Sequence, residues 1–315
     1  MRHFLGVGDV ENPKALIDKA LQIKKDPFAQ AHLGKNKTSG LIFFNASIRT
    51  RLSTQRAAQN LGLQTIVMNI DQEGWGLEFE DGAVMNGHKA EHIREAAAVM
   101  GQYCEIIGVR AFAKLQDRQA DYAETVLRKF QQFAGVPIIS LESEIRHPLQ
   151  SLTDLITIEE WKPKPKPKVV LTWAPHPKAL PQAVANSLVE WLHTTDYEWV
   201  IAHPEGYALA DEFVKGAPTT HDQNAALANA DFVYAKNWSS YRQYGQVLHQ
   251  DPSWTITPAK MQLTNQAKFM HCLPVRRNVI VADAVLDSDA SIVVQQAANR
   301  VWAAQAVLTE ILHQL

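Results

Sequence analysis

Apolar residues recur along the chain in short blocks that alternate with segments of helical periodicity. In the first half, blocks rich in β-branched and aromatic residues predict strands at residues 40–45, 64–70, 105–110 and 136–141. Between them, residues 50–62 and 91–103 carry apolar side chains at a spacing near 3.6, which predicts amphipathic helices. The first of these helices closes on Gly62, a residue favoured just after a helix end.

The second half repeats this alternation. Apolar blocks predict strands at residues 168–175, 198–204, 231–236 and 268–274, with helices at 181–193 and 224–230. Alternation on this scale is typical of parallel sheets covered by helices, so we expect an α/β fold with two doubly wound parallel-sheet domains.

The join between the two halves has its own pattern. Residues 147–161 predict an amphipathic helix, and the following KPKPKPK cannot continue a helix, which favours an extended connector. A long amphipathic helix starts at Gln295. We therefore expect domains at residues 1–147 and 148–294, with interdomain helices and a C-terminal helix, 295–315, that returns to the first domain.

Composition narrows the class of protein. Apolar residues make up 46% and charged residues 20% of the 315, which describes a soluble globular protein. Because 31 basic and 33 acidic side chains leave a net charge of −2, the overall field offers nothing to nucleic acid. Two cysteines give no disulfide framework, residues 1–13 lack a signal-peptide core, and no apolar stretch reaches membrane length. The expected location is the cytoplasm.

The segment FFNASIRTR places hydroxyl and arginine side chains where a buried strand gives way to a helix. Ser47, Arg49, Thr50 and Arg51 would lie in the first helical turn, whose unpaired N–H groups suit a phosphate. Arginine forks would add bidentate contacts. The alternative is a capping serine with arginines on a solvated face, but one exposed stripe cannot hold both Arg49 and Arg51.

Two further segments carry candidate residues. RHPLQ places His147 and Gln150 one turn apart at a helix start, and Arg110 ends a strand of the same domain. In HCLPVRR, alternation along a strand keeps His271 and Cys272 from forming a nucleophilic dyad, so the Leu273 backbone and the following two arginines are better substrate contacts.

HKAEH, residues 88–92, matches the H-x-x-E-H pattern of some metallopeptidases. No third ligand is identifiable, so no metal site is predicted.

The motifs SIRTR, RHPLQ and HCLP, in this order, resemble those of the aspartate/ornithine carbamoyltransferase family. The resemblance runs from near the N-terminus to the last helix, with Ile48 in place of the usual Thr. It implies no metal or organic cofactor. It also implies a carbamoyl phosphate site of Ser47, Arg49, Thr50, Arg51, Arg110, His147, Gln150, Arg300 and the neighbouring subunit's Trp75.

Within this family the chain looks like the branch that acts on N-acylated ornithine. It lacks the Ser-Met-Gly loop of ornithine members, and it has YAKNW around Lys236 and a Pro-rich stretch at residues 175–182. The branch implies a trefoil knot in the second domain and a homotrimer. The implied acylornithine contacts are Glu142, His176, Lys236, Cys272, Leu273, Arg276 and, from the neighbouring subunit, Ala90.

The acyl group depends on Ala90, because the acetyl branch carries Glu there and the succinyl branch carries Pro. A carboxylate at this position would repel a succinyl carboxylate, whereas Ala leaves room for it. With His176, Lys236 and Arg276 as cationic or donor groups for two carboxylates, we expect N-succinyl-L-ornithine as the acceptor.

The product would be N-succinyl-L-citrulline, in arginine biosynthesis, with Arg110, His147 and Thr50 polarising the carbonyl group. The alternatives are N-acetyl-L-ornithine as the acceptor, a non-catalytic anion-binding subunit and, more remotely, a zinc hydrolase.

Overall fold

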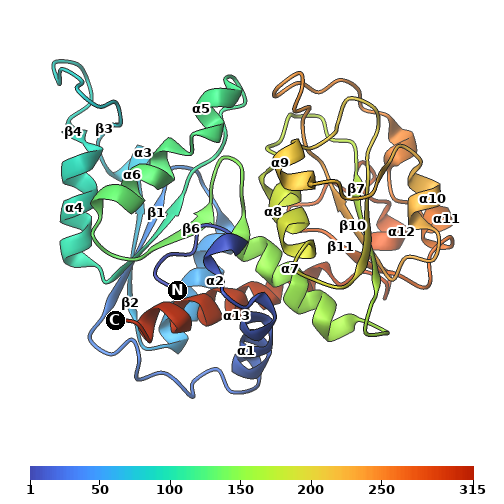
Figure 1. Ribbon diagram of the computed structural model, residues 1–315, viewed down its shortest axis with the longest axis horizontal. Coiled ribbons are helices and arrows are strands. Elements are labelled where there is room, and N and C mark those ends of the chain that lie inside the picture. The colour runs from blue at the N-terminus through green and yellow to red at the C-terminus, as the bar shows by residue number, and fades with distance from the viewer. The chain divides into compact units, whose positions relative to one another are not determined.

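The computed structural model describes all 315 residues except the side chain of Asp71. The chain divides into two compact units, each an α/β fold with a parallel sheet and flanking helices (Figure 1). Unit 1 comprises residues 1–114, 119–152 and 300–315, and unit 2 comprises 115–118 and 153–299. The expectation of an α/β fold built from two parallel-sheet domains is confirmed.

Unit 1 is built on a four-stranded parallel sheet with the order β2-β1-β5-β6. Phe43, at the end of β1, lies opposite Arg110, at the end of β5. A separate two-stranded pair, β3 and β4, precedes α4. The strands are β1 (Thr38–Phe43), β2 (Gln64–Asn69), β3 (Leu77–Glu78), β4 (Glu91–His92), β5 (Ile106–Arg110) and β6 (Ile138–Glu142).

Helices cover both faces of this sheet. Helices α4 (Ile93–Tyr103) and α6 (Thr125–Phe133) bury apolar side chains against the strands. Because parallel crossovers are right-handed, the chain order places α2 (Ile48–Asn60) on the opposite face. There, Asn60 of α2 donates a 2.9 Å hydrogen bond to Gln305 of α13 (Val293–Leu312). The other helical segments are η1 (Val7–Asp9), α1 (Pro13–Lys25), α3 (Ile70–Glu73) and α5 (Arg118–Tyr122).

Unit 2 contains a five-stranded parallel sheet with the order β11-β10-β7-β8-β9. Helices α8 (Ala183–Leu192) and α9 (Asp211–Val214) lie on one side of it, and α10, α11 and α12 on the other (Figure 1). Tryptophans 173, 191 and 238 are fully buried in this unit. The remaining elements are α7 (Pro148–Trp161), β7 (Lys168–Trp173), β8 (Glu198–Ala202), β9 (Thr219–Thr220), α10 (Gln223–Leu227), β10 (Phe232–Lys236), η2 (Pro252–Trp254), α11 (Pro258–Met261), β11 (Lys268–Met270) and α12 (Asp283–Leu286).

All eight predicted strands are present, but five of them (β1, β2, β7, β8 and β11) end one to four residues earlier than the apolar blocks suggest. Strand β7 ends at Trp173, and β11 ends at Met270 because Leu273 has a left-handed backbone (φ +57°) and proline cannot donate to a ladder. The six predicted helices are also present, and Gly62 follows α2 with a φ of +81°. The proline-lysine connector is not helical, as predicted.

Helix α1 is absent from the expectations, although Asn12 caps it and Pro13 occupies its first position. Among the described residues, no helix combines the length and apolar character needed to cross a bilayer.

Candidate active site

The polar residues singled out in the first half of the chain gather at the carboxyl ends of the unit 1 strands. Strand β1 leads into Ser47, β5 ends on Arg110, and β6 ends on Glu142. Strands β1 and β5 are neighbours at the centre of the sheet. The chain passes from β1 outward to β2 at one edge and from β5 outward to β6 at the opposite edge, so the direction of the connections reverses between β1 and β5. Open α/β sheets bind ligands at such a switch point.

The amino end of α2 opens toward this edge. Ser47 has an extended backbone, and its Oγ accepts a 3.3 Å hydrogen bond from the Thr50 backbone N–H, so it caps the helix. Arg49 and Arg51 are partly exposed in the same turn. The partial positive charge of the helix end and the two guanidinium groups therefore all attract an anion to this edge.

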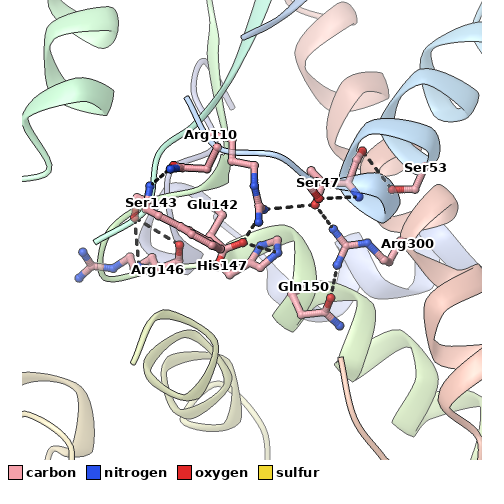
Figure 2. A network of polar contacts seen from close by, with 12 residues as sticks. Ser47, Ser53, Arg110, Glu142, Ser143, Arg146, His147, Gln150 and Arg300 are labelled. Atoms are coloured by element: carbon pink, nitrogen blue, oxygen red, sulfur yellow. Dashed lines mark hydrogen bonds and ion pairs between the residues drawn. The ribbon is translucent and has the colours of Figure 1, made fainter. Parts of the chain in front are cut away.

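Thr50 is where three distant parts of the chain meet. Its Oγ1 accepts hydrogen bonds from Arg300 Nη2 at 2.7 Å and from Arg110 Nη1 at 3.4 Å. In Figure 2, Arg300 extends between the first turn of α2 and Gln150, and its Nη1 donates to the Gln150 Oε1. Thr50 and Gln150 are buried almost completely. Four residues that the sequence spreads over 250 positions thus form one cluster.

Arg110 also contacts Glu142, which in turn lies next to His147. Its Nη1 donates to Glu142 Oε2, and His147 Nε2 lies 3.3 Å from the same carboxylate oxygen (Figure 2). The guanidinium carbon lies 4.5 Å over the Phe112 ring, which fixes its plane. Arg110 Nε is buried without a hydrogen-bond partner among the described residues. We call Thr50, Arg110, Glu142, His147, Gln150 and Arg300 the Thr50 cluster.

The charge balance of the Thr50 cluster favours an anion. Arg110 and Arg300 are each 6% exposed, and Glu142 supplies one buried carboxylate. A buried cation is stabilised only when an anion or strong acceptor faces it. Two guanidinium groups that converge on one hydroxyl, beside a helix amino end, can therefore hold a small doubly charged group such as phosphate.

A second set of contacts supports the loop between Glu142 and His147. Ser143 Oγ donates to Glu124 Oε1 at 2.5 Å, and Arg146 Nη1 donates to Glu124 Oε2 at 3.3 Å. Glu124 is buried and has a left-handed backbone, with a φ of +46°. Nothing in the sequence singled out Glu124, because a lone glutamate before a helix carries no pattern of its own.

Glu144 lies in this loop, and its carboxyl group titrates unusually. It is 8% exposed, and its Oε2 has no hydrogen-bond partner among the described residues. Burial raises the pKa of Glu144 to about 7, and the nearby Glu124 and Asp121 carboxylates add to the shift. Because the pKa of Glu144 is higher in the folded chain than in the unfolded chain, the free energy of unfolding falls as the pH rises from the unfolded pKa of 4.5 to the folded pKa of about 7.

We therefore expect Glu144→Gln to raise the free energy of unfolding at pH 8 by about 2–3 kcal/mol, because it removes the cost of a buried charge. At pH 4, below both pKa values, the two proteins should differ little. Chemical unfolding at a series of pH values measures this, with the exposed Glu205→Gln as the control. Equal gains at pH 4 and pH 8 would mean that ionisation of Glu144 is not the cause.

The candidates of unit 2 form a separate polar group. Arg276 Nε donates to His176 Nε2 at 2.9 Å, so this ring nitrogen is unprotonated, and His176 Nδ1 lies 2.9 Å from the Lys178 carbonyl oxygen. Burial lowers the pKa of His176, and the Arg276 charge lowers it further. His176 is thus the neutral partner of Arg276 rather than a second cation. Lys236 ends β10, is buried, and donates to the Asn237 carbonyl at 2.9 Å.

The two arginines after the HCLP motif differ in their partners. Arg277 is bound by Asp283 at 2.9 Å and Asp287 at 2.6 Å, and these contacts raise its pKa. Arg276 remains the better candidate for a substrate. His271 Nδ1 accepts a 2.9 Å hydrogen bond from the Leu273 N–H, which agrees with the absence of a His271–Cys272 dyad.

Trp75 and Ala90 lie together on the loop formed by β3 and β4. The Ala90 N–H donates to the Gly76 carbonyl at 3.1 Å, and Trp75 Nε1 donates to Glu91 Oε2 at 2.8 Å. Trp75 is 59% exposed. Both nitrogens of His92 have partners, Glu80 O and Arg94 N–H, and no group of metal-ligating side chains occurs among the described residues.

Comparison with known proteins assigns the family. The aspartate/ornithine carbamoyltransferase carbamoyl-P binding domain matches residues 2–160, and the Asp/Orn binding domain of the same family matches residues 181–311. The chain belongs to the aspartate/ornithine carbamoyltransferase family. The resemblance predicted from the three motifs is therefore confirmed.

Two relatives and one solved structure show which members of the family this chain resembles. An N-succinylornithine carbamoyltransferase of Bacteroides thetaiotaomicron is 53% identical over 317 residues, covering 100% of both chains. An N-acetylornithine carbamoyltransferase of Xanthomonas campestris is 35% identical, covering 100% of this chain and 98% of the relative.

The solved structure is an N-acetyl-L-ornithine transcarbamylase variant with one glutamate replaced by alanine, complexed with carbamyl phosphate and N-succinyl-L-norvaline. It matches with a TM-score of 0.92 and 35% identity, over 99% of this chain and 100% of that chain.

Proposed function

We infer that this family member transfers the carbamoyl group of carbamoyl phosphate to the δ-amine of N-succinyl-L-ornithine, a cytoplasmic step of arginine biosynthesis. The products are N-succinyl-L-citrulline and phosphate. The observation that carries the proposal is the Thr50 cluster, in which Arg110 and Arg300 converge on one hydroxyl at the amino end of α2. This arrangement suits a phosphate next to a polarised carbonyl group.

In the proposed mechanism, the neutral δ-amine attacks the carbonyl carbon, a C–N bond forms, and the bond from that carbon to the phosphate oxygen breaks. Arg110, His147 and Thr50 donate to the carbonyl oxygen as negative charge develops there. The leaving phosphate accepts the amine proton, so the protein needs no base of its own. The residues that hold the phosphate and neutralise it as it leaves are Ser47, Arg49, Thr50, Arg51, Gln150 and Arg300.

Glu142 has two roles in this proposal. Its carboxylate accepts from Arg110 and faces His147 Nε2, and it thereby orients the two donors that the carbonyl group requires. It is also the partner of the acceptor's acylamide region. Arg276, presented by neutral His176, and Lys236 bind the two carboxylates of the acceptor, while Cys272 and Leu273 orient the amine through main-chain carbonyls.

The succinyl group is favoured over the acetyl group by two observations. Identity is 53% to the N-succinylornithine enzyme and 35% to the N-acetylornithine enzyme. The family pattern has Glu at position 90 in the acetyl branch, and an N-acetyl-L-ornithine transcarbamylase with one glutamate replaced by alanine was crystallised with a succinyl ligand. Ala90 of the neighbouring subunit would leave the same room here.

The neighbouring subunit enters through a proposed homotrimer, in which Trp75 completes the carbamoyl phosphate site. Ile48 and Leu52, one turn apart on α2, are 76% and 61% exposed beside the Thr50 cluster. Large apolar side chains exposed next to a site favour burial by another copy of the chain. The trefoil knot of the second domain remains part of the same proposal.

The function is tested by measuring phosphate release from carbamoyl phosphate with ornithine, N-acetylornithine, N-succinylornithine or aspartate. We expect release and a carbamoylated product with N-succinylornithine, at a rate that a chelator leaves unchanged. Preference for N-acetylornithine would support the alternative acceptor. No acceptor-dependent release with any of the four would indicate an anion-binding subunit, and loss of activity on chelation would indicate a metal enzyme.

A further inference from the structure

The turn that carries Cys272 and Leu273 is held by side chains outside the site described above. It follows β11 in unit 2, and Leu273 has a φ of +57°, which a residue with a side chain adopts only when its surroundings fix it. One of its backbone donors is satisfied within the turn, from Leu273 N–H to His271 Nδ1. A second, the His271 N–H, donates to Gln296 Oε1 at 2.9 Å.

Gln296 connects the turn to a buried carboxylate. It lies on α13, and its Nε2 donates to Asp154 Oδ1, on α7, at 2.7 Å. Both side chains are completely buried within unit 2. Because an amide has one donating and one accepting end, Asp154 sets which end of Gln296 faces His271.

Tyr234 lies beside this arrangement, and its hydroxyl has no hydrogen-bond partner among the described residues. Its fully buried hydroxyl faces Asp154 and Cys272, and burial together with the Asp154 charge raises the pKa of Tyr234 well above its ordinary value. The hydroxyl therefore stays protonated. The hydrogen bonds that join Asp154 to the turn run through Gln296 to His271.

A purely structural role would be to join α7 to α13, but other residues of the same helices already do so. Asn299 of α13 donates to Thr157 of α7 at 3.0 Å, and this hydrogen bond joins the two helices without involving the turn. A buried carboxylate is costly, and hydrogen-bonded pairs of neutral side chains join helices without that cost. The Asp154–Gln296 pair differs from the Asn299–Thr157 pair because Gln296 also accepts a hydrogen bond from a backbone N–H of the turn, that of His271.

We propose that Asp154 and Gln296 are positioning residues that fix the Cys272–Leu273 turn so that its carbonyl groups orient the acceptor amine. The proposal rests on the proposed function, because the turn matters to catalysis only if an acceptor amine is bound there. Neither residue touches the substrate in this role. Their loss should weaken use of the acylornithine and leave carbamoyl phosphate binding intact.

Two single variants and one double variant test this role. Gln296→Met removes the acceptor of the His271 N–H, and Gln296→Glu places a second carboxylate 2.7 Å from Asp154. We expect either change to raise the KM for N-succinylornithine about tenfold or to lower kcat by a similar factor, with the KM for carbamoyl phosphate within about twofold of wild type. In Gln296→Glu the defect should grow as the pH rises and the new carboxyl group ionises.

The double variant Asp154→Asn with Gln296→Glu should restore acceptor kinetics to within about threefold of wild type. The new amide at position 154 then donates to the new carboxylate at position 296, which still accepts from the His271 N–H, so the pair is reversed but complete. The matched control is Thr157→Val, which removes a buried hydrogen bond between the same helices and should change stability without changing either KM. Rescue by the reversed pair distinguishes positioning from general helix packing.

Hydrogen exchange of the peptide that contains His271 and Leu273 gives a readout independent of catalysis. Exchange there should be faster in Gln296→Met than in wild type and Thr157→Val, and close to wild type in the double variant. Unchanged acceptor kinetics and unchanged exchange in both Gln296 variants would refute the positioning role. If wild type itself carbamoylates no acceptor, the proposed function fails instead, and exchange still decides whether the pair holds the turn.

Discussion

Arg110→Ala is expected to lower kcat by about 10²–10³-fold, because Arg110 is the donor best placed to stabilise negative charge on the carbonyl oxygen. It is buried, held over the Phe112 ring, and shared between Thr50 and Glu142. Its loss removes an interaction that strengthens in the transition state, so kcat should fall more than the KM for carbamoyl phosphate rises. Steady-state kinetics with both substrates varied measures the effect.

Truncation of Arg110 also removes a positive charge that pairs with the buried Glu142 carboxylate, which should lower stability. Folding must therefore be measured together with activity. Thermal unfolding checks that the variant is folded at the assay temperature. Arg128→Ala is the matched control, because it removes a partly exposed arginine that pairs with Glu124, outside the Thr50 cluster. Turnover of a folded Arg110→Ala protein equal to wild type would exclude Arg110 from the oxyanion role.

The features that were predictable from the sequence are those encoded locally. The strands are buried in parallel sheets and therefore read as continuous apolar runs, such as residues 106–110 and 138–142. The candidate phosphate loop was likewise visible because the capping Ser47 and the first turn of α2 are adjacent in sequence. Such elements depend on neighbouring residues, which a periodicity or a capping pattern reports.

Contacts between distant residues left no comparable pattern. Thr50 and Arg300 meet across 250 positions, and Arg300 entered the candidate site only through the family resemblance. Glu124, which holds the Ser143–Arg146 loop, was missed because neither its spacing nor its neighbours distinguish it. The protonation state of His176 could not be inferred either, since it follows from burial and from an arginine 100 positions away.

The acyl preference is expected to reverse when Ala90 is replaced by glutamate. Two like charges about 4 Å apart repel by up to about 4 kcal/mol at an effective dielectric constant near 20, and partial solvation reduces this to about 1–3 kcal/mol. The ratio of kcat/KM for N-succinylornithine to that for N-acetylornithine should therefore fall about 10–100-fold. Ala90 is exposed in the β3–β4 loop, so the longer side chain should not disturb folding.

Ala90→Gln separates charge from size, because glutamine has nearly the shape of glutamate without its carboxylate. If repulsion chooses the acyl group, Gln should change the ratio much less than Glu, and raised salt should weaken the effect of Glu. Equal shifts for Gln and Glu would assign the preference to space in the pocket. An unchanged ratio in both variants would show that position 90 does not face the acyl group, and the proposed contribution of the neighbouring subunit's loop to acceptor selection would then be wrong.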